Sequence, residues 1–152
     1  MRLNNKIAVI TGGSRGIGFA VAERFLEEGA TVILTASSQA TSEKAVSKLK
    51  EKYPLAVVEG IWPDLSSLQA VSEAFARVVD RYGRIDILVN NAGVSESTPL
   101  LSYTEETFDK VMDLNVKGVF NASRAAAEHM AASGSGVILS TSSMVSIYGQ
   151  PA

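Results

Sequence analysis

Cysteine is absent from the 152-residue chain, and the chain has a single histidine, His129. Without cysteine, the sequence excludes disulfide scaffolds, thiolate metal sites and cysteine nucleophiles. One histidine is too few for a histidine-rich zinc site and argues against a catalytic triad built on histidine. We therefore expect no metal site, and a chemistry that uses neither a thiolate nor a triad imidazole.

The chain also lacks a marked excess of charge of either sign, with 14 basic and 16 acidic residues. Proteins that bind nucleic acids generally carry a strongly basic surface, so this balance predicts no nucleic-acid partner. No apolar run approaches the roughly 18–20 residues that cross a bilayer, and the first residues lack the apolar segment of a signal peptide. We expect a soluble protein in the cytoplasm, with no membrane partner.

Short apolar runs alternate with longer amphipathic segments along the chain. The sequence predicts strands at residues 7–10, 31–35, 56–61, 85–89 and 137–140, and helices at residues 17–28, 41–52, 64–82 and 104–133. Strands separated by helices of this length pair in parallel through βαβ crossovers. Because the strands are apolar throughout, we expect helices on both faces of the sheet in a single α/β unit.

A glycine-rich segment, Thr11-Gly12-Gly13-Ser14-Arg15-Gly16-Ile17-Gly18, joins the first predicted strand to the first predicted helix. Glycine lets the backbone turn sharply and approach a phosphate, and the free N–H groups at a helix start attract a pyrophosphate. The spacing is neither G-x-G-x-x-G nor that of a P-loop, which requires Gly-Lys-Ser/Thr. A turn without a ligand is the alternative, but the place on the first βα turn favours a dinucleotide site.

Five motifs along the chain resemble those of the short-chain dehydrogenase/reductase family. They are T-G-x-x-x-G-x-G at residues 11–18, Asp64-Leu65, Asn90-Asn91-Ala92-Gly93, Asn115, and Ser140-Thr141-Ser142-Ser143. The resemblance implies a Rossmann-type, doubly wound parallel sheet of strand order 3-2-1-4-5, continued by a sixth and a seventh strand. Residues 1–152 would then be the NADP(H)-binding, N-terminal portion of a single domain of this family.

The resemblance also implies a site for a nicotinamide cofactor. Its residues would be Gly12, Ser14, Arg15, Gly16, Ile17 and Gly18 in the glycine-rich segment, Asp64 and Leu65 at the adenine, Asn91, Ala92 and Gly93 along the riboses, and Val116 beside the nicotinamide. An acid at the end of the second strand would repel a 2′-phosphate, but Ala36 stands there. Arg15 offers a guanidinium fork and Ser37 a hydroxyl, so we expect NADP(H) rather than NAD(H).

Three residues near this site have alternative interpretations. Arg15, taken alone, would suit a solvated loop charge. Asp64 would also suit the N-cap of the third helix. Trp62 is expected to pack against the protein rather than to contact a substrate.

The resembled family uses an Asn–Ser–Tyr–Lys tetrad, of which two members have matching positions in this chain. Asn115 matches the asparagine, although a local polar group that kinks the helix is an alternative. Ser143 is our choice for the serine, with Ser142 as the fallback, because Tyr148-Gly149-Gln150-Pro151 resembles the family's approach to its active-site tyrosine. None of the four tyrosines is followed four residues later by lysine, so the Tyr-x-x-x-Lys pair is missing from the sequence.

Without further strands, residues 137–140 would form a sheet edge that no charge or proline protects. The helix at residues 104–133 would also lack cover for its apolar residues Phe108, Val111, Met112, Val119, Phe120, Ala126 and Met130. We therefore expect the chain to be the N-terminal part of a longer polypeptide that carries the tyrosine and the lysine. By resemblance the same helix contributes to a homo-oligomer, a dimer or a tetramer.

The resemblance implies an NADP(H)-dependent oxidoreductase that interconverts a small-molecule ketone and a secondary alcohol. The glycine-rich segment and the acid-free second strand resemble those of 3-oxoacyl-[acyl-carrier-protein] reductases, which implies a 3-oxoacyl thioester on acyl carrier protein as the substrate. Hydroxysteroid, sugar-alcohol and polyol dehydrogenases share the same motifs and stay open. So do two other classes, an inactive truncated NADP(H)-binding module and a structural subunit that completes its sheet with another chain.

Overall fold

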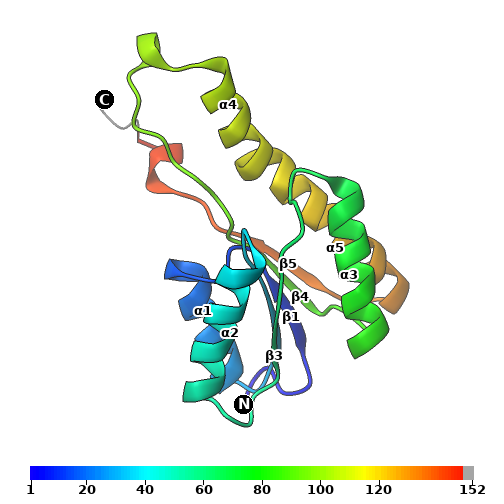
Figure 1. The fold of residues 1–152 in the computed structure, drawn as a ribbon. Coiled ribbons are helices and arrows are strands. Elements are labelled where there is room, and N and C mark those ends of the chain that lie inside the picture. Colours follow the sequence, from blue (N-terminus) through cyan, green and yellow to red (C-terminus); the bar gives the residue numbers. More distant parts are fainter. Residues whose placement is uncertain (149–152) are drawn as a thin grey trace.

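The structure of the protein, a computed structural model, describes residues 1–148 and contains one five-stranded sheet. Figure 1 shows this sheet between two groups of helices. The strands are β1 Ile7–Ile10, β2 Thr31–Thr35, β3 Val58–Ile61, β4 Ile87–Asn90 and β5 Val137–Ser140. All neighbouring strands are parallel, in the order β3-β2-β1-β4-β5. The predicted fold class and strand order are confirmed.

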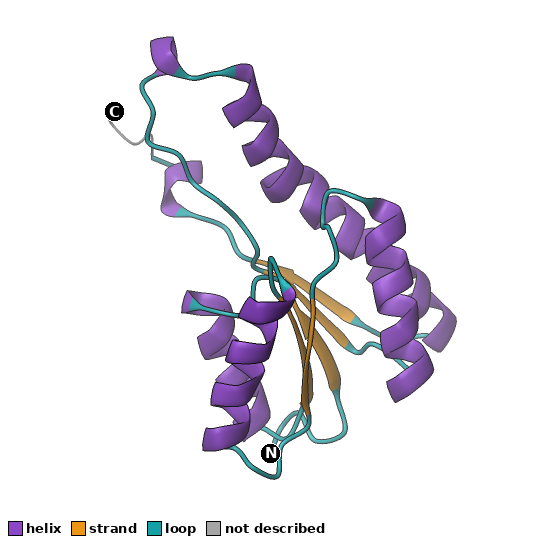
Figure 2. Cartoon of the chain, viewed as in Figure 1, coloured by secondary structure: helices purple, strands orange, loops and turns teal. Residues whose placement is uncertain are grey.

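Helices cover both faces of the sheet (Figure 2). Those on one face are α1 Gly16–Glu27 and α2 Gln39–Lys52, and those on the other are α3 Leu68–Tyr82 and α5 Val119–Ser133. A long rod, residues 105–133, consists of α4 Glu105–Met112, the π-helical segment η2 Asp113–Gly118, and α5. Short 3₁₀ helices occur at η1 Leu100–Ser102 and η3 Met144–Ser146. In the described part of the chain, no helix has the length and hydrophobicity that crossing a membrane requires.

Helix α3 begins later than predicted. The Asp64 carboxylate accepts hydrogen bonds from the backbone N–H and the hydroxyl of Ser66, at 2.9 and 2.7 Å, which form a turn ahead of the helix. Ser67 is the N-cap, and its hydroxyl accepts a hydrogen bond from the N–H of Ala70 at 3.2 Å. The interpretation of Asp64 as the N-cap was therefore wrong, because Asp64 closes the preceding turn instead.

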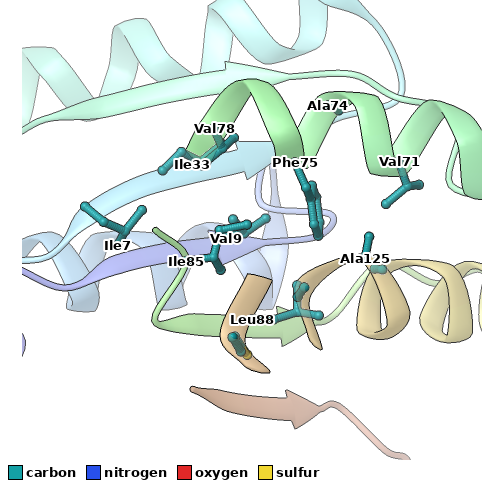
Figure 3. Packing of buried hydrophobic residues seen from close by; sticks show 13 residues of the cluster. Ile7, Val9, Ile33, Val71, Ala74, Phe75, Val78, Ile85, Leu88 and Ala125 are labelled. Atoms are coloured by element: carbon teal, nitrogen blue, oxygen red, sulfur yellow. The ribbon is translucent and has the colours of Figure 1, made fainter. Parts of the chain in front are cut away.

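The apolar core lies on both faces of the sheet. Towards α3 and α5, Val9 and Leu88 of the sheet belong to one fully buried cluster with Phe75 of α3 (Figure 3). Towards α1 and α2, Ile10 and Leu34 form the second cluster with residues of these helices. Successive strand residues point to opposite faces, so strands that are buried on both faces are apolar throughout. This two-sided core fixes the sheet on which the loops of the site stand.

The outer surface next to β5 is apolar and exposed. Val137, Ile138 and Leu139 of β5 are 51%, 38% and 49% exposed, which agrees with the predicted unprotected edge. On the long rod, Phe108, Met112 and Phe120 are exposed as expected, and Val116 continues the same stripe. The expectation was wrong for Ala126 and Met130, which are buried in the core with residues of α3, and Val111 and Val119 are half-buried.

Asp86 joins β1 to the start of β4, at the end of the sheet opposite the glycine-rich segment. Its carboxylate accepts hydrogen bonds from the N–H of Ile7 and from Nε of Arg84, both at 2.9 Å, and lies 3.4 Å from Nζ of Lys6. Burial raises the pKa of Asp86, but the hydrogen bonds from Ile7 and Arg84 together with the cationic charges outweigh it and hold the pKa below its usual value. Asp86 is thus a carboxylate that stabilises the folded chain.

We expect the substitution Asp86→Asn to lower the free energy of unfolding at neutral pH by about 1–3 kcal/mol, because charged hydrogen bonds are lost in a buried place. Since folding lowers the pKa of Asp86, its contribution is fully present above the unfolded-state pKa of about 4 and is lost as the pH falls through the folded-state pKa. Urea unfolding of both proteins from neutral to acid pH measures this. A difference that stays constant down to low pH would contradict the role of Asp86.

Candidate active site

The glycine loop, residues 11–18, is held by the hydroxyls of two buried threonines. Oγ1 of Thr11 accepts hydrogen bonds from the N–H groups of Asn91 and Ala92, both at 3.0 Å. Oγ1 of Thr35 accepts a hydrogen bond from the N–H of Gly12 at 3.1 Å. These bonds join the loop to the ends of β2 and β4, so three segments far apart in the sequence meet at the carboxyl edge of the sheet, where open α/β sheets bind ligands.

Two glycines of this loop are required by close approach of the backbone. A Cβ at Gly12, whose φ is +64°, would lie 2.8 Å from Cα of Ala92. A Cβ at Gly18 would collide with the carbonyl oxygen of Gly12 and would lie 2.5 Å from Nδ2 of Asn91. Gly18 therefore acts by letting α1 pack against the loop.

A cavity of about 1280 Å³ opens at this edge of the sheet. The predicted cofactor residues that line it are Gly12, Ser14, Arg15, Gly16, Ile17, Ser37, Asp64, Leu65, Asn91, Ala92 and Gly93. Its volume exceeds the roughly 300–1,000 Å³ of pockets for drug-sized ligands, so it has room for a dinucleotide. Gly18 lies behind the loop, and Val116, which is 54% exposed on η2, lies outside the lining.

One end of the cavity is suited to an anion. Arg15 is the N-cap of α1, and its side chain makes no capping hydrogen bond. Ser37 lines the cavity directly before Ser38, the N-cap of α2, and the first turn of α2 contains no acidic residue. Helix starts attract negative charge, and a guanidinium forms paired hydrogen bonds with phosphate.

The loop between β3 and α3, residues 62–67, forms another wall. Hydrogen bonds from the hydroxyl and N–H of Ser66 lower the pKa of Asp64, so Asp64 faces the cavity as a carboxylate at neutral pH. The expectation that Trp62 packs was wrong, because its side chain is 48% exposed and lines the cavity.

Asn115 lies in η2 and holds the loop that follows β4. Its Oδ1 accepts a hydrogen bond from the N–H of Val94 at 2.9 Å, and its Nδ2 donates to the carbonyl of Val94 at 2.8 Å. A Cβ at Gly93 would lie 3.2 Å from the same Oδ1, so the two segments are in close contact. The alternative of a satisfied polar group in an irregular helix thus describes its local structure, while the catalytic role of Asn115 stays a prediction.

Ser143 follows β5 and is the N-cap of η3, where its hydroxyl accepts a hydrogen bond from the N–H of Val145 at 3.4 Å. Ser143, Ser142 and Asn115 lie outside the cavity lining. Of the predicted segment Tyr148-Gly149-Gln150-Pro151, residues 149–151 lie outside the described residues. The structure therefore leaves the choice between the two serines as a prediction.

Sequence reasoning missed several residues at this site. Thr35 looked like an ordinary β-branched strand residue, and Asn121 lay unremarked in the predicted helix at residues 104–133. Acidic residues of the long rod also line the cavity, at Glu105, Glu106, Asp109 and Asp113. Their helical spacing was visible in the sequence, but the loop that brings this rod to the cavity was not.

Comparison with known proteins gives consistent matches. Residues 6–152 match the family model described as short chain dehydrogenase. A 3alpha-hydroxysteroid dehydrogenase of Mediterraneibacter gnavus is 53% identical over 151 residues, which cover 99% of this chain and 60% of that protein. A 3-oxoacyl-[acyl-carrier-protein] reductase of Thermotoga maritima is 39% identical over 152 residues, with 99% and 61% covered.

Among solved structures, NAD+-bound xylitol dehydrogenase is similar with a TM-score of 0.92 and 32% identity, covering 99% of this chain and 58% of that chain. Levodione reductase is similar with a TM-score of 0.92 and 34% identity, covering 98% and 58%. The chain spans about three-fifths of the length of the curated relatives it matches.

Proposed function

The chain belongs to the short-chain dehydrogenase/reductase family of oxidoreductases, and we propose that residues 1–152 form the NADP(H) site of an enzyme that interconverts a ketone and a secondary alcohol. These residues would be the N-terminal portion of one domain of that enzyme. The family binds a nicotinamide cofactor. The observation that carries the proposal is the cavity at the carboxyl edge of the sheet, lined by the glycine loop and by the loops after β3 and β4. The cofactor supplies hydride transfer, and these loops bind and orient it.

The choice of NADP(H) over NAD(H) rests on the anion-binding end of the cavity. Ala36 is uncharged where an acid would repel a 2′-phosphate. Arg15 and Ser37 line the same cavity, and the start of α2 directly follows Ser37. The guanidinium, the hydroxyl and the helix start attract a phosphate, and the uncharged Ala36 does not repel one.

We further propose Asn115 and Ser143 as two members of the catalytic tetrad. Asn115 grips both backbone groups of Val94, so it orders the loop that follows Gly93 at the cavity wall. Ser143 would hold the carbonyl oxygen of the substrate through its hydroxyl. The tyrosine and lysine of a Tyr-x-x-x-Lys pair would provide and tune the proton donor elsewhere in the full-length protein.

A hydroxysteroid or the corresponding ketosteroid is our first candidate substrate. The relative at 53% identity is a 3alpha-hydroxysteroid dehydrogenase. A 3-oxoacyl thioester is the second candidate, supported by the relative at 39% identity.

The stripe of Phe108, Met112, Val116 and Phe120, exposed along the long rod, supports a homo-oligomer as the assembly.

The location in the cytoplasm stays a prediction.

The full-length protein tests the proposal when NADP+ is mixed with 3alpha-hydroxysteroids, and NADPH with ketosteroids, 3-oxoacyl-CoA and 3-oxoacyl carrier protein. We expect steroid turnover. Turnover of the thioesters alone would favour the second candidate, cofactor binding without any turnover would favour a binding module, and absence of cofactor binding would overturn the proposal.

Substitution of the predicted serine gives a sharper result. We expect Ser143→Ala to lower kcat about 100-fold or more, because a donor to the carbonyl oxygen is lost, while the Kd of NADPH is unchanged. Ser142→Ala is the matched control and is expected to keep most of the activity. The reverse pattern would assign the role to Ser142.

A further inference from the structure

The long rod touches two walls of the cavity through buried or paired asparagines. Asn115 pairs with Val94 in the loop after β4, as described above. Six residues further along, Asn121 of α5 is only 3% exposed, and its Nδ2 donates a hydrogen bond to the carbonyl oxygen of Leu65 at 2.9 Å. A buried amide is costly unless it is paired, and the Leu65 carbonyl supplies a partner for Asn121.

The rod and the β3–α3 loop are also in van der Waals contact beside this bond. Gly118, which is buried less than one turn before Asn121, lies against the loop, because a Cβ there would be in van der Waals contact with Cβ of Leu65 at 3.4 Å. Leu65 itself packs against the core cluster between the sheet, α3 and α5. The rod therefore contacts the β3–α3 loop at Leu65 through both a hydrogen bond and apolar packing.

The same loop carries the residues that face the cavity. Asp64, Leu65 and Ser66 all line it. The hydrogen bonds of Asp64 with Ser66 and of the Ser67 N–H with the Asp64 carbonyl set the shape of the loop. The bond from Asn121 is of another kind, because it ties this loop to a helix 56 residues away in the sequence.

We propose that Asn121 is a positioning residue for the adenosine half of the cofactor. It holds the Leu65 carbonyl, and through Leu65 it fixes the cavity wall at which Asp64 and Leu65 are placed for the adenine. The inference rests on the proposed NADP(H) site. Because Asn115 holds the loop after β4 from the same rod, each asparagine serves a different wall of the cavity.

The test separates the two halves of the cofactor in the full-length protein. Asn121→Asp keeps the shape of the side chain, but an ionised carboxylate cannot donate to the Leu65 carbonyl and repels it. We expect the Kd values of NADPH and of 2′,5′-ADP, the adenosine half, to rise about tenfold in calorimetric titrations. The Kd of reduced nicotinamide mononucleotide is expected to stay unchanged, and kcat at saturating NADPH is expected to stay near that of the wild type.

Two further variants guard against a general loss of structure. Asn121→Ala removes the donor without burying a charge and is expected to give the same selective loss. Met130→Ala creates a cavity near the other end of the same helix, where Met130 is buried beside Gly136. It is expected to lower stability while the ratio of the two fragment affinities stays constant.

The outcomes distinguish the inference from the proposed function. If the wild-type protein binds neither NADPH nor 2′,5′-ADP, the proposed function is overturned, and this inference with it. If the wild type binds both and the Asn121 variants bind them equally well, only the inference is overturned. An equal loss of both fragments in the Asn121 variants would also overturn it, because Asn121 would then act on the fold as a whole.

Discussion

Replacing Gly18 with alanine is expected to weaken NADP(H) binding by the full-length protein about 5- to 150-fold, the range that overpacking of 1–3 kcal/mol produces. The added methyl group would collide with the carbonyl oxygen of Gly12 and press on Nδ2 of Asn91. That amide donates hydrogen bonds to the carbonyls of Thr11 and Gly12, at 3.2 and 3.3 Å. The Gly12 carbonyl belongs to the backbone, and the Asn91 amide is held in place by these two hydrogen bonds, so the loop must shift.

The control for Gly18→Ala is a substitution at a glycine that lies outside the cavity lining, where the added Cβ strains only the local backbone. Gly83, the C-cap of α3, has a φ of +85° and no atom within 4 Å of an added Cβ. Gly83→Ala is therefore expected to cost about 1 kcal/mol of stability and to leave the Kd of NADPH unchanged. Calorimetric titration of both variants decides the matter. Wild-type affinity in Gly18→Ala would contradict the packing role of this glycine.

The parts of the fold that follow from local chemistry were predictable from the sequence. The bounds of β1, β2 and β5 came out as predicted, because each is a short apolar run bounded by turn residues. The start of α3 was not predicted correctly, because the polar residues Asp64, Ser66 and Ser67 can all form hydrogen bonds in the turn before the helix. Asp64 and Ser67 are both good N-caps, and only the bonds of Asp64 with Ser66 decide between them.

The residues missed at the site depend on partners far along the chain. Thr35 holds the glycine loop 23 residues before it, and Asn121 holds Leu65 at a separation of 56 residues. The π-helical segment η2 also involves a distant partner, because Asn115 within it pairs with Val94 of the loop after β4. A periodic pattern reports which face of a helix is apolar, but it does not report which loop a polar residue on that helix meets.

Placing an acid at position 36 is expected to reverse the cofactor preference. Ala36 directly follows β2, lines the cavity beside Ser37, and is 8% exposed. In Ala36→Asp, a carboxylate would stand near the place proposed for the 2′-phosphate. Two unit charges about 5 Å apart at an effective dielectric constant of about 20 repel by about 3 kcal/mol, which corresponds to roughly a hundredfold change in affinity.

The same carboxylate would accept hydrogen bonds from the ribose hydroxyls of NAD(H), so affinity for that cofactor should rise while affinity for NADP(H) falls. The ratio of kcat/KM for the two cofactors, measured on full-length wild type and Ala36→Asp, reports the change. Ala36→Asn is the matched control, because it has the same shape without the charge and should retain the preference for NADP(H). Since the effect is electrostatic, it should weaken as salt is added. Equal ratios in the Asp and Asn variants would mean that charge at position 36 does not select the cofactor, and that Arg15 and Ser37 act without it.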